Sequence, residues 1–164
     1  MPKLAQIRTA QPKDALEMAA ILNEIIAIGG TTAFEDPVSS EQITQWYIES
    51  DALYCCHVAV DDTGKIAGFQ SLESNEDDAD RIGYIATFAR QSPLVKGVGT
   101  ALFETTKIKA RGQGVSVINA KIRADNASGL AYYTKMGFLD HDVKRGIPLK
   151  DGTPIDRIIK LFTF

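Results

Sequence analysis

The sequence predicts a mixed α/β fold, an α+β arrangement in which one mixed sheet lies between helices in a three-layer core. Two observations support this prediction. Apolar residues recur at helical spacing in about four segments, and runs rich in Val, Ile, Tyr and Phe fill strand-length stretches between them. The chain has 164 residues without repeats or low-complexity tracts, so we expect a single domain over residues 1–164.

The first half of the chain is expected to contain a short strand, two helices and a strand hairpin. Pro12 and Asp14 begin the first helix, and Gly29-Gly30 ends it. Ser40 is the expected cap of the second helix, and Asp61-Asp62-Thr63-Gly64 has the composition of a hairpin turn. The corresponding ranges are a strand at 5–10, helices at 12–28 and 41–50, and strands at 53–60 and 65–72.

The second half is expected to alternate strands with two further helices. The acidic stretch from Glu73 to Asp80 is best explained as a solvated loop, and Gly137 stands where a glycine ends the last helix. The long helix is expected to bury one face, made of Val98, Ala101, Leu102, Thr105 and Ile108. The ranges are strands at 81–89, 114–122, 138–144 and 155–162, and helices at 97–111 and 126–136.

Composition excludes several classes of function. The chain carries 18 Lys and Arg against 21 Asp and Glu, a net charge of −3, which argues against general nucleic-acid binding. No apolar run reaches the length of a membrane span. Cys55 and Cys56 are strand neighbours that point to opposite faces, so we expect two reduced thiols in a cytoplasmic protein. With only His57 and His141 available, no metal site is expected.

A glycine-rich turn carries the strongest chemical signal along the chain. The segment from Val95 to Thr100 follows a strand-like run and opens a helix, whose first N–H groups lack intrahelical partners and suit a phosphate. It does not fit a Walker loop, because Lys96 precedes Gly97, or a dinucleotide fingerprint, because Leu102 occupies the place of the third glycine. Taken alone, the turn is also compatible with an ordinary strand-to-helix connection.

A second motif gives that turn its context. Asn126, Tyr133, Gly137 and Phe138 follow the spacing Asn, then Tyr seven residues on, then Gly-Phe eleven and twelve on. With the turn, this pattern resembles the signature of the GCN5-related N-acetyltransferase (GNAT) superfamily. Finer features resemble its phosphinothricin-acetyltransferase-like branch. These are the segment Thr31–Glu35, and Gly146, Lys150, Gly152 and Asp156 near the end of the chain.

The resemblance implies acetyl-CoA as co-substrate, no metal, and a mostly antiparallel central sheet that splays at the acyl-CoA site. It implies transfer of the acetyl group to a primary amine of a small amino-acid-like molecule, by direct attack in a ternary complex. Tyr133 fits the general acid, because a phenol with a pKa of about 10 is protonated at neutral pH. The implied acetyl-CoA-binding residues are Thr87, Phe88, Ala89, Val95, Lys96, Gly97, Val98, Gly99, Thr100, Asn126 and Tyr133.

The chain also departs from the family pattern. Leu94 replaces a loop glutamine, and Tyr84 stands where many members carry a glutamate that acts as general base. Glu35 borders the expected acceptor pocket and is our candidate base; Glu73, His57 or no base at all are the alternatives. The missing strand glutamate favours a rival function, an inactive acyl-CoA-binding sensor, and protein N-acetylation is a third option. The resemblance also suggests a homodimer.

Overall fold

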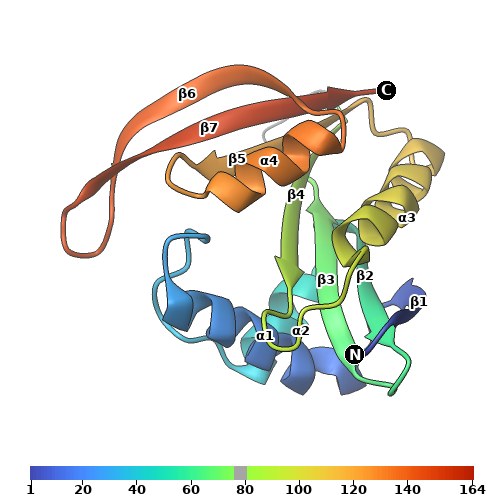
Figure 1. Cartoon of the computed structure of the whole chain (residues 1–164). Helices are drawn as coiled ribbons and strands as arrows, with labels where there is room; N and C mark the ends of the chain where they lie inside the picture. Colours follow the sequence, from blue (N-terminus) through green and yellow to red (C-terminus); the bar gives the residue numbers. More distant parts are fainter. Residues whose placement is uncertain (76–80) are drawn as a thin grey trace.

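The computed structural model describes residues 1–75 and 81–164, and within them seven strands form one open sheet (Figure 1). The strand order is β1-β2-β3-β4-β5-β7-β6, and all neighbours are antiparallel except β4 and β5. The strands are β1 (Leu4–Thr9), β2 (Leu53–Asp61), β3 (Ile66–Glu73), β4 (Ile82–Ala89), β5 (Val117–Arg123), β6 (Leu139–Pro148) and β7 (Pro154–Thr163). The predicted mixed, mostly antiparallel sheet is therefore confirmed.

Helices cover both faces of this sheet. They are α1 (Ala15–Ile28), which a short 3-10 turn η1 (Pro12–Asp14) precedes, α2 (Ser40–Tyr47), α3 (Val98–Gly112) and α4 (Ala127–Lys135). α1 and α2 pack on one face, and α3 and α4 on the other, which gives the predicted three layers. The acidic stretch predicted as a loop begins with Glu73, the last residue of β3, and its positions 76–80 lie outside the described residues.

The sheet is splayed between β4 and β5. These strands pair in parallel through only three residue pairs, from Ile82 with Val117 to Tyr84 with Asn119. β4 nevertheless continues to Ala89 against β3, and β5 continues to Arg123 against β7. The described residues 85–89 and 120–123 therefore have no sheet partner across the gap. The prediction of a splayed sheet is confirmed.

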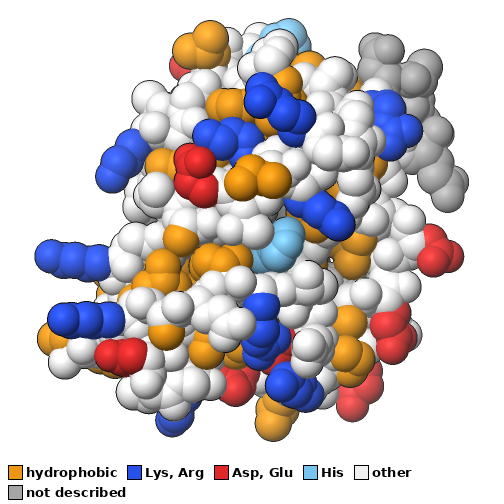
Figure 2. All heavy atoms as spheres, turned by 90° about the vertical axis from the view of Figure 1, so that its right-hand side faces the viewer, with side chains coloured by type: hydrophobic (Ala, Val, Ile, Leu, Met, Phe, Trp, Pro, Cys, Tyr) orange, Lys and Arg blue, Asp and Glu red, His pale blue; other side chains and the backbone are white. Residues whose placement is uncertain are grey.

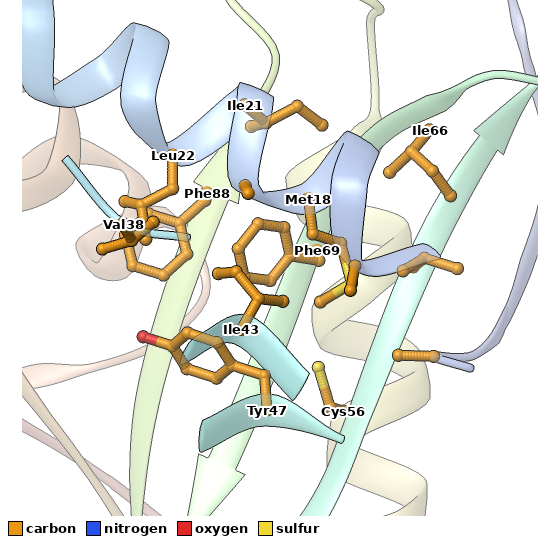
Figure 3. Packing of buried hydrophobic residues seen from close by; sticks show 14 of the residues in the cluster. Met18, Ile21, Leu22, Val38, Ile43, Tyr47, Cys56, Ile66, Phe69 and Phe88 are labelled. Atoms are coloured by element: carbon orange, nitrogen blue, oxygen red, sulfur yellow. The ribbon is translucent and has the colours of Figure 1, made fainter. Parts of the chain in front are cut away.

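A core of apolar side chains fills the space between the sheet and the pair α1 and α2. Figure 3 shows Phe69 of β3 and Phe88 of β4 among Met18 and Leu22 of α1 and Tyr47 of α2. Each such side chain contributes roughly 1.5–3 kcal/mol when fully buried. Cys56 belongs to this core, whereas Cys55 packs against the core on the other face, and both thiols are free. The two cysteines thus point to opposite faces, as predicted.

The cap of α2 is Ser39, so the assignment to Ser40 was wrong. The Ser39 Oγ accepts from the Gln42 backbone N–H at 3.1 Å, and the Gln42 side chain accepts from the Ser39 N–H at 2.9 Å. This reciprocal capping box needs a Glu or Gln three residues after the cap, and only Ser39 has one at that spacing. α2 also ends at Tyr47, earlier than predicted.

The buried face of α3 is rotated from the predicted one. Ile108 is 74% exposed, whereas Phe103 is 1% exposed. The ring of Phe103 packs against Phe138 and Phe162, with ring centroids 5.3 and 5.4 Å apart. An aromatic ring buries more surface than an isoleucine, and its partners come from distant parts of the chain, so tertiary packing decides the rotation. The buried residues of α3 are Val98, Leu102, Phe103, Thr106 and Ala110.

Two further observations concern the surface and the helices. On the face that carries α3, Lys and Arg side chains are interspersed with acidic and hydrophobic ones (Figure 2). Among the described residues, no helix has both the length and the apolar character needed to cross a membrane.

Candidate functional site

The N-terminus of α3 presents unpaired backbone donors at the end of the gap. Gly97 adopts a left-handed conformation, with φ +81°, and turns the chain into the helix. The first bond of the helix runs from the Ala101 N–H to the Gly97 carbonyl at 3.0 Å. Within the described residues, no side chain caps this end, so the N–H groups of residues 98–100 lack protein partners. With Lys96 exposed beside them, these groups can hold an anion.

The two glycines of this turn have different roles. Gly97 needs glycine for its positive φ, and a side chain there would meet open space. At Gly99, a Cβ would lie 2.6 Å from the Cε1 of Tyr132. Gly99 therefore lets the Tyr132 ring of α4 pack against the first turn of α3, a reason that the sequence alone did not reveal.

A buried ion pair fixes the loop between β4 and α3. The Arg90 Nη2 lies 2.8 Å from the Asp61 Oδ2, and its Nε donates to the Pro93 carbonyl at 3.0 Å. Hydrogen bonds from Thr63 and from Arg90 hold the pKa of the Asp61 carboxyl well below its usual range. The turn that begins α3 is thus tied to the β2–β3 hairpin. Sequence reasoning missed this contact, because no local pattern marks it.

Tyr133 reaches into the splayed region from α4. Its side chain is buried against the ring of Phe138, with centroids 5.1 Å apart, and its Oη lies 2.8 Å from the Thr87 Oγ1 of β4. Burial raises the pKa of the Tyr133 phenol, so this group stays protonated at neutral pH. The structure therefore brings together two predicted site residues from different elements, Thr87 and Tyr133.

Asn126 caps α4 rather than forming its first turn. Its Oδ1 accepts from the Gly129 N–H at 2.9 Å, and its Nδ2 donates to the Thr31 carbonyl at 3.1 Å. Asn126 thereby connects α4 to the loop between α1 and α2. Gly137 ends the helix region with φ +102°, as the motif predicts.

A hollow of about 570 Å³ lies between the α1–α2 loop and the β6–β7 hairpin. Glu35 accepts from the Lys150 backbone N–H at 2.9 Å, and the Lys150 Nζ pairs with Asp36 at 2.7 Å. Phe34 stacks on Trp46 at 5.7 Å, and its ring centroid is 6.4 Å from that of Phe88. The hollow is thus next to β4. Its lining residues are Ala33–Val38, Gln42, Trp46 and Pro148–Lys150.

The three candidate bases lie on different elements, and the structure does not gather them. Glu35 is on the exposed α1–α2 loop. Glu73 ends β3 opposite Tyr84, and burial raises the pKa of its carboxyl. His57 of β2 lies on the sheet face opposite to Cys56, and burial lowers the pKa of its imidazole. Among the described residues, no three His, Cys, Asp or Glu side chains form a group that could hold a metal.

Comparison with known proteins identifies the family. A sequence model of the Acetyltransferase (GNAT) family matches residues 20–138, more than half of the chain. The chain belongs to the GNAT acetyltransferase family. Within this family it resembles proteins named as N-acetyltransferases of the phosphinothricin-acetyltransferase-like branch, so the predicted family and enzyme class are confirmed.

Three relatives illustrate the similarity. The L-methionine sulfoximine/L-methionine sulfone acetyltransferase of Pseudomonas aeruginosa is 30% identical over 139 residues, 82% of this chain and 80% of the relative. YwnH of Bacillus subtilis, provisionally named a phosphinothricin acetyltransferase, is 28% identical over 155 residues, 92% of this chain and 93% of YwnH. The phosphinothricin acetyltransferase of Sinorhizobium meliloti, solved with AcCoA, superposes with a TM-score of 0.81 at 20% identity, covering 98% of this chain and 88% of that one.

Proposed function

We propose that this GNAT enzyme transfers the acetyl group of acetyl-CoA to the primary amine of a small amino-acid-like molecule, by direct attack in a ternary complex. The observation that carries the proposal is the gap between β4 and β5, which runs from the unpaired N–H groups of α3 to the Tyr133 hydroxyl. The names of the Pseudomonas aeruginosa and Bacillus subtilis relatives support a small acceptor.

Acetyl-CoA would lie along this gap. We assign the pyrophosphate to the turn Val95–Thr100, where the N–H groups of Val98, Gly99 and Thr100 and the charge of Lys96 favour an anion. The backbone of Thr87–Ala89 has no partner strand on the side of β5. The pantetheine arm would pair with this backbone in the way that an added strand does. Asn126 would bind the arm from the opposite side of the gap.

The chemistry follows from this placement. The amine nitrogen forms a bond to the thioester carbon, the carbon–sulfur bond breaks, and the sulfur leaves with its electron pair. One backbone N–H of the segment Phe88–Ala89 would stabilise the oxyanion. Tyr133 would donate its hydroxyl proton in a hydrogen bond to the departing sulfur, because its raised pKa keeps it protonated. The nitrogen loses its proton to a base.

We propose Glu35 as that base. Its loop borders the hollow beside β4, and Phe34 places the loop against Phe88. Glu73 is the alternative, because burial raises the pKa of its carboxyl and makes it a stronger base. In the structure, Glu35 accepts a hydrogen bond from the Lys150 N–H. The two candidates are compared by measuring the acetyl-transfer activity of Glu35→Gln and Glu73→Gln under the same conditions.

An uncompensated cation supports an acceptor that carries a carboxylate. Arg157 of β7 lies opposite Arg123 of β5 and opposite Lys144 of β6, so the three share one sheet face. Arg123 pairs with Asp125 at 2.7 Å, whereas Arg157 has no acidic partner among the described residues. Arg123 also donates to the Thr32 carbonyl, which places this face beside the α1–α2 loop and the hollow. An amino-acid carboxylate would complement it.

We further propose that the enzyme acts as a homodimer in the cytoplasm. β6 forms an edge of the sheet, and its Leu139 and Val143 are 75% and 37% exposed. An exposed edge strand with apolar side chains could pair with a second copy of the chain. The two free thiols support a reducing compartment.

Thiol release from acetyl-CoA tests the proposed function. Purified protein is mixed with acetyl-CoA and, separately, phosphinothricin, L-methionine sulfoximine, L-methionine sulfone and an alanine-terminated peptide, and the product is verified by mass. We expect turnover of a small acceptor, lowered about 100-fold in Tyr133→Phe. Turnover of the peptide alone would make the chain a protein acetyltransferase. Acetyl-CoA binding without turnover of any acceptor would favour the sensor.

A further inference from the structure

A fully buried glutamine lies beneath the proposed catalytic tyrosine. Gln70 of β3 is 0% exposed and stands directly opposite Thr87 of β4. Its Nε2 donates to the Thr87 Oγ1 at 2.9 Å and to the Tyr132 Oη at 3.1 Å. Burial of an amide costs free energy that only its hydrogen bonds offset, so an apolar residue would be the simpler choice for this core position.

The partners of Tyr132 determine the direction of two hydrogen bonds in this group. The Tyr132 hydroxyl lies 2.7 Å from the Gly99 carbonyl oxygen, which can only accept, so Tyr132 donates to it. The Tyr132 oxygen must then accept from Gln70. Both amide hydrogens of Gln70 are used, one on Tyr132 and one on Thr87. Turning the amide over would set the Gln70 Oε1 against the Tyr132 oxygen, two acceptors, so the bond to Tyr132 favours the observed orientation, in which Oε1 is buried without a partner among the described residues.

The orientation of Gln70 affects whether Thr87 donates or accepts in its hydrogen bond with Tyr133. The Thr87 oxygen accepts from Gln70, which makes its own hydroxyl a stronger donor and its oxygen a weaker acceptor for a second bond. The Thr87 and Tyr133 hydroxyl oxygens lie 2.8 Å apart, and this polarisation favours Thr87 as the donor between them. Tyr133 then keeps its own proton free for a group in the gap. Donation from Thr87 also stabilises the negative charge that grows on the Tyr133 oxygen as this proton is shared.

We propose that Gln70 is a positioning residue of acetyl transfer, which makes Thr87 a donor to Tyr133 and so leaves the Tyr133 proton available to the leaving sulfur. The proposal rests on the proposed function, because it needs Tyr133 to act on that sulfur. Gln70 itself touches no substrate. Its effect reaches the reaction only through Thr87, and this dependence gives a sharp test.

The test is a double-variant cycle measured on kcat and on the KM for acetyl-CoA, with the fastest acceptor of the panel above. Gln70→Met keeps the length of the side chain and removes its donors. We expect kcat to fall about tenfold with the KM for acetyl-CoA unchanged. In a Tyr133→Phe background the same substitution should have no further effect, because the group it prepares is gone. A purely structural loss would lower kcat in both backgrounds.

Ser71→Ala is the matched control. Ser71 is the next residue of β3, is 1% exposed and carries a buried hydroxyl without a partner among the described residues, but it points to the opposite face. We expect its kcat to equal that of the parent. If Gln70→Met does not fold, Gln70→Leu, which also removes the amide donors, replaces it in the same cycle.

The outcomes separate the two proposals. If the parent turns over no acceptor, the proposed function fails. If the parent is active and Tyr133→Phe is slow, but Gln70→Met matches the parent or adds its full loss to Tyr133→Phe, the role of Gln70 is refuted while the proposed function stands.

Discussion

The turn before α3 offers a prediction with a built-in control. Gly97 and Gly64 both have positive φ, +81° and +84°, and at both positions a Cβ would have nothing within 4 Å. Gly64 lies in the β2–β3 hairpin turn, away from the gap. Substitution of either glycine by alanine should therefore lower the free energy of unfolding only through backbone strain, by about 1 kcal/mol. For a chain of this length that lowers Tm by roughly 2–4 °C.

The two variants should differ once acetyl-CoA is added. At about 100 times Kd, a ligand that binds only the folded protein stabilises it by about 2.7 kcal/mol. In Gly97→Ala the added methyl occupies the open space beside the N–H groups of α3, and we expect affinity to fall about tenfold. The same acetyl-CoA concentration would then stabilise by only about 1.4 kcal/mol. Acetyl-CoA should still stabilise Gly64→Ala by the full amount, about 2.7 kcal/mol.

Thermal unfolding of the parent and both variants, each with and without acetyl-CoA, measures these quantities. An equal acetyl-CoA-induced rise of Tm in Gly97→Ala and Gly64→Ala would refute the assignment of the pyrophosphate to this turn. Equal losses of Tm without ligand are needed first, because they show that the two substitutions are matched in strain.

Three further predictions follow from other contacts. Because the pKa of Asp61 is lowered, its contribution to stability is present above the unfolded value of about 3.9 and is lost as pH falls below it. The Tm of the parent should therefore fall more steeply between pH 5 and 3 than the Tm of Asp61→Asn. At pH 7 the Asp61→Asn variant should be less stable than the parent by about 3 kcal/mol. Ser39→Ala should cost about 1 kcal/mol in chemical denaturation and Ser40→Ala much less; the reverse order would reject the capping box. Arg157→Ala should raise the KM for a carboxylate-bearing acceptor and leave the KM for acetyl-CoA unchanged. An unchanged KM for the acceptor would exclude a contact between Arg157 and its carboxylate.

Local signals predicted much of the fold. Gly29 and Gly137 end helical regions as their sequence positions indicate, and the strands of the hairpin around Gly64 lie within one or two residues of their predicted bounds. β6 is longer than predicted, because it continues through Gly146 to Pro148 with a register shift after Lys144. Glycine and proline are typical of turns, so a single sequence favours an earlier end.

Contacts between distant segments could not be predicted. Gln70 meets Thr87 only because β3 and β4 pair in one register, and one residue of slip would place them on opposite faces. Likewise the ion pair between Arg90 and Asp61 joins the loop after β4 to the end of β2, across the intervening strand β3. A polar residue amid the apolar run of β3 was the visible signal for Gln70, but it did not identify a partner.

The short ladder between β4 and β5 also bears on how the protein opens. Three residue pairs join the half-sheet β1–β4 to the half-sheet β5–β7, so this seam is where cooperative unfolding is expected to begin. Amide hydrogens bordering the seam should exchange with solvent sooner than those of β2 and β3. An extended ligand in the gap would act as a missing strand and slow exchange on both sides at once. Acetyl-CoA would then be both a reactant and a structural part of the folded enzyme, and its depletion would loosen the whole sheet.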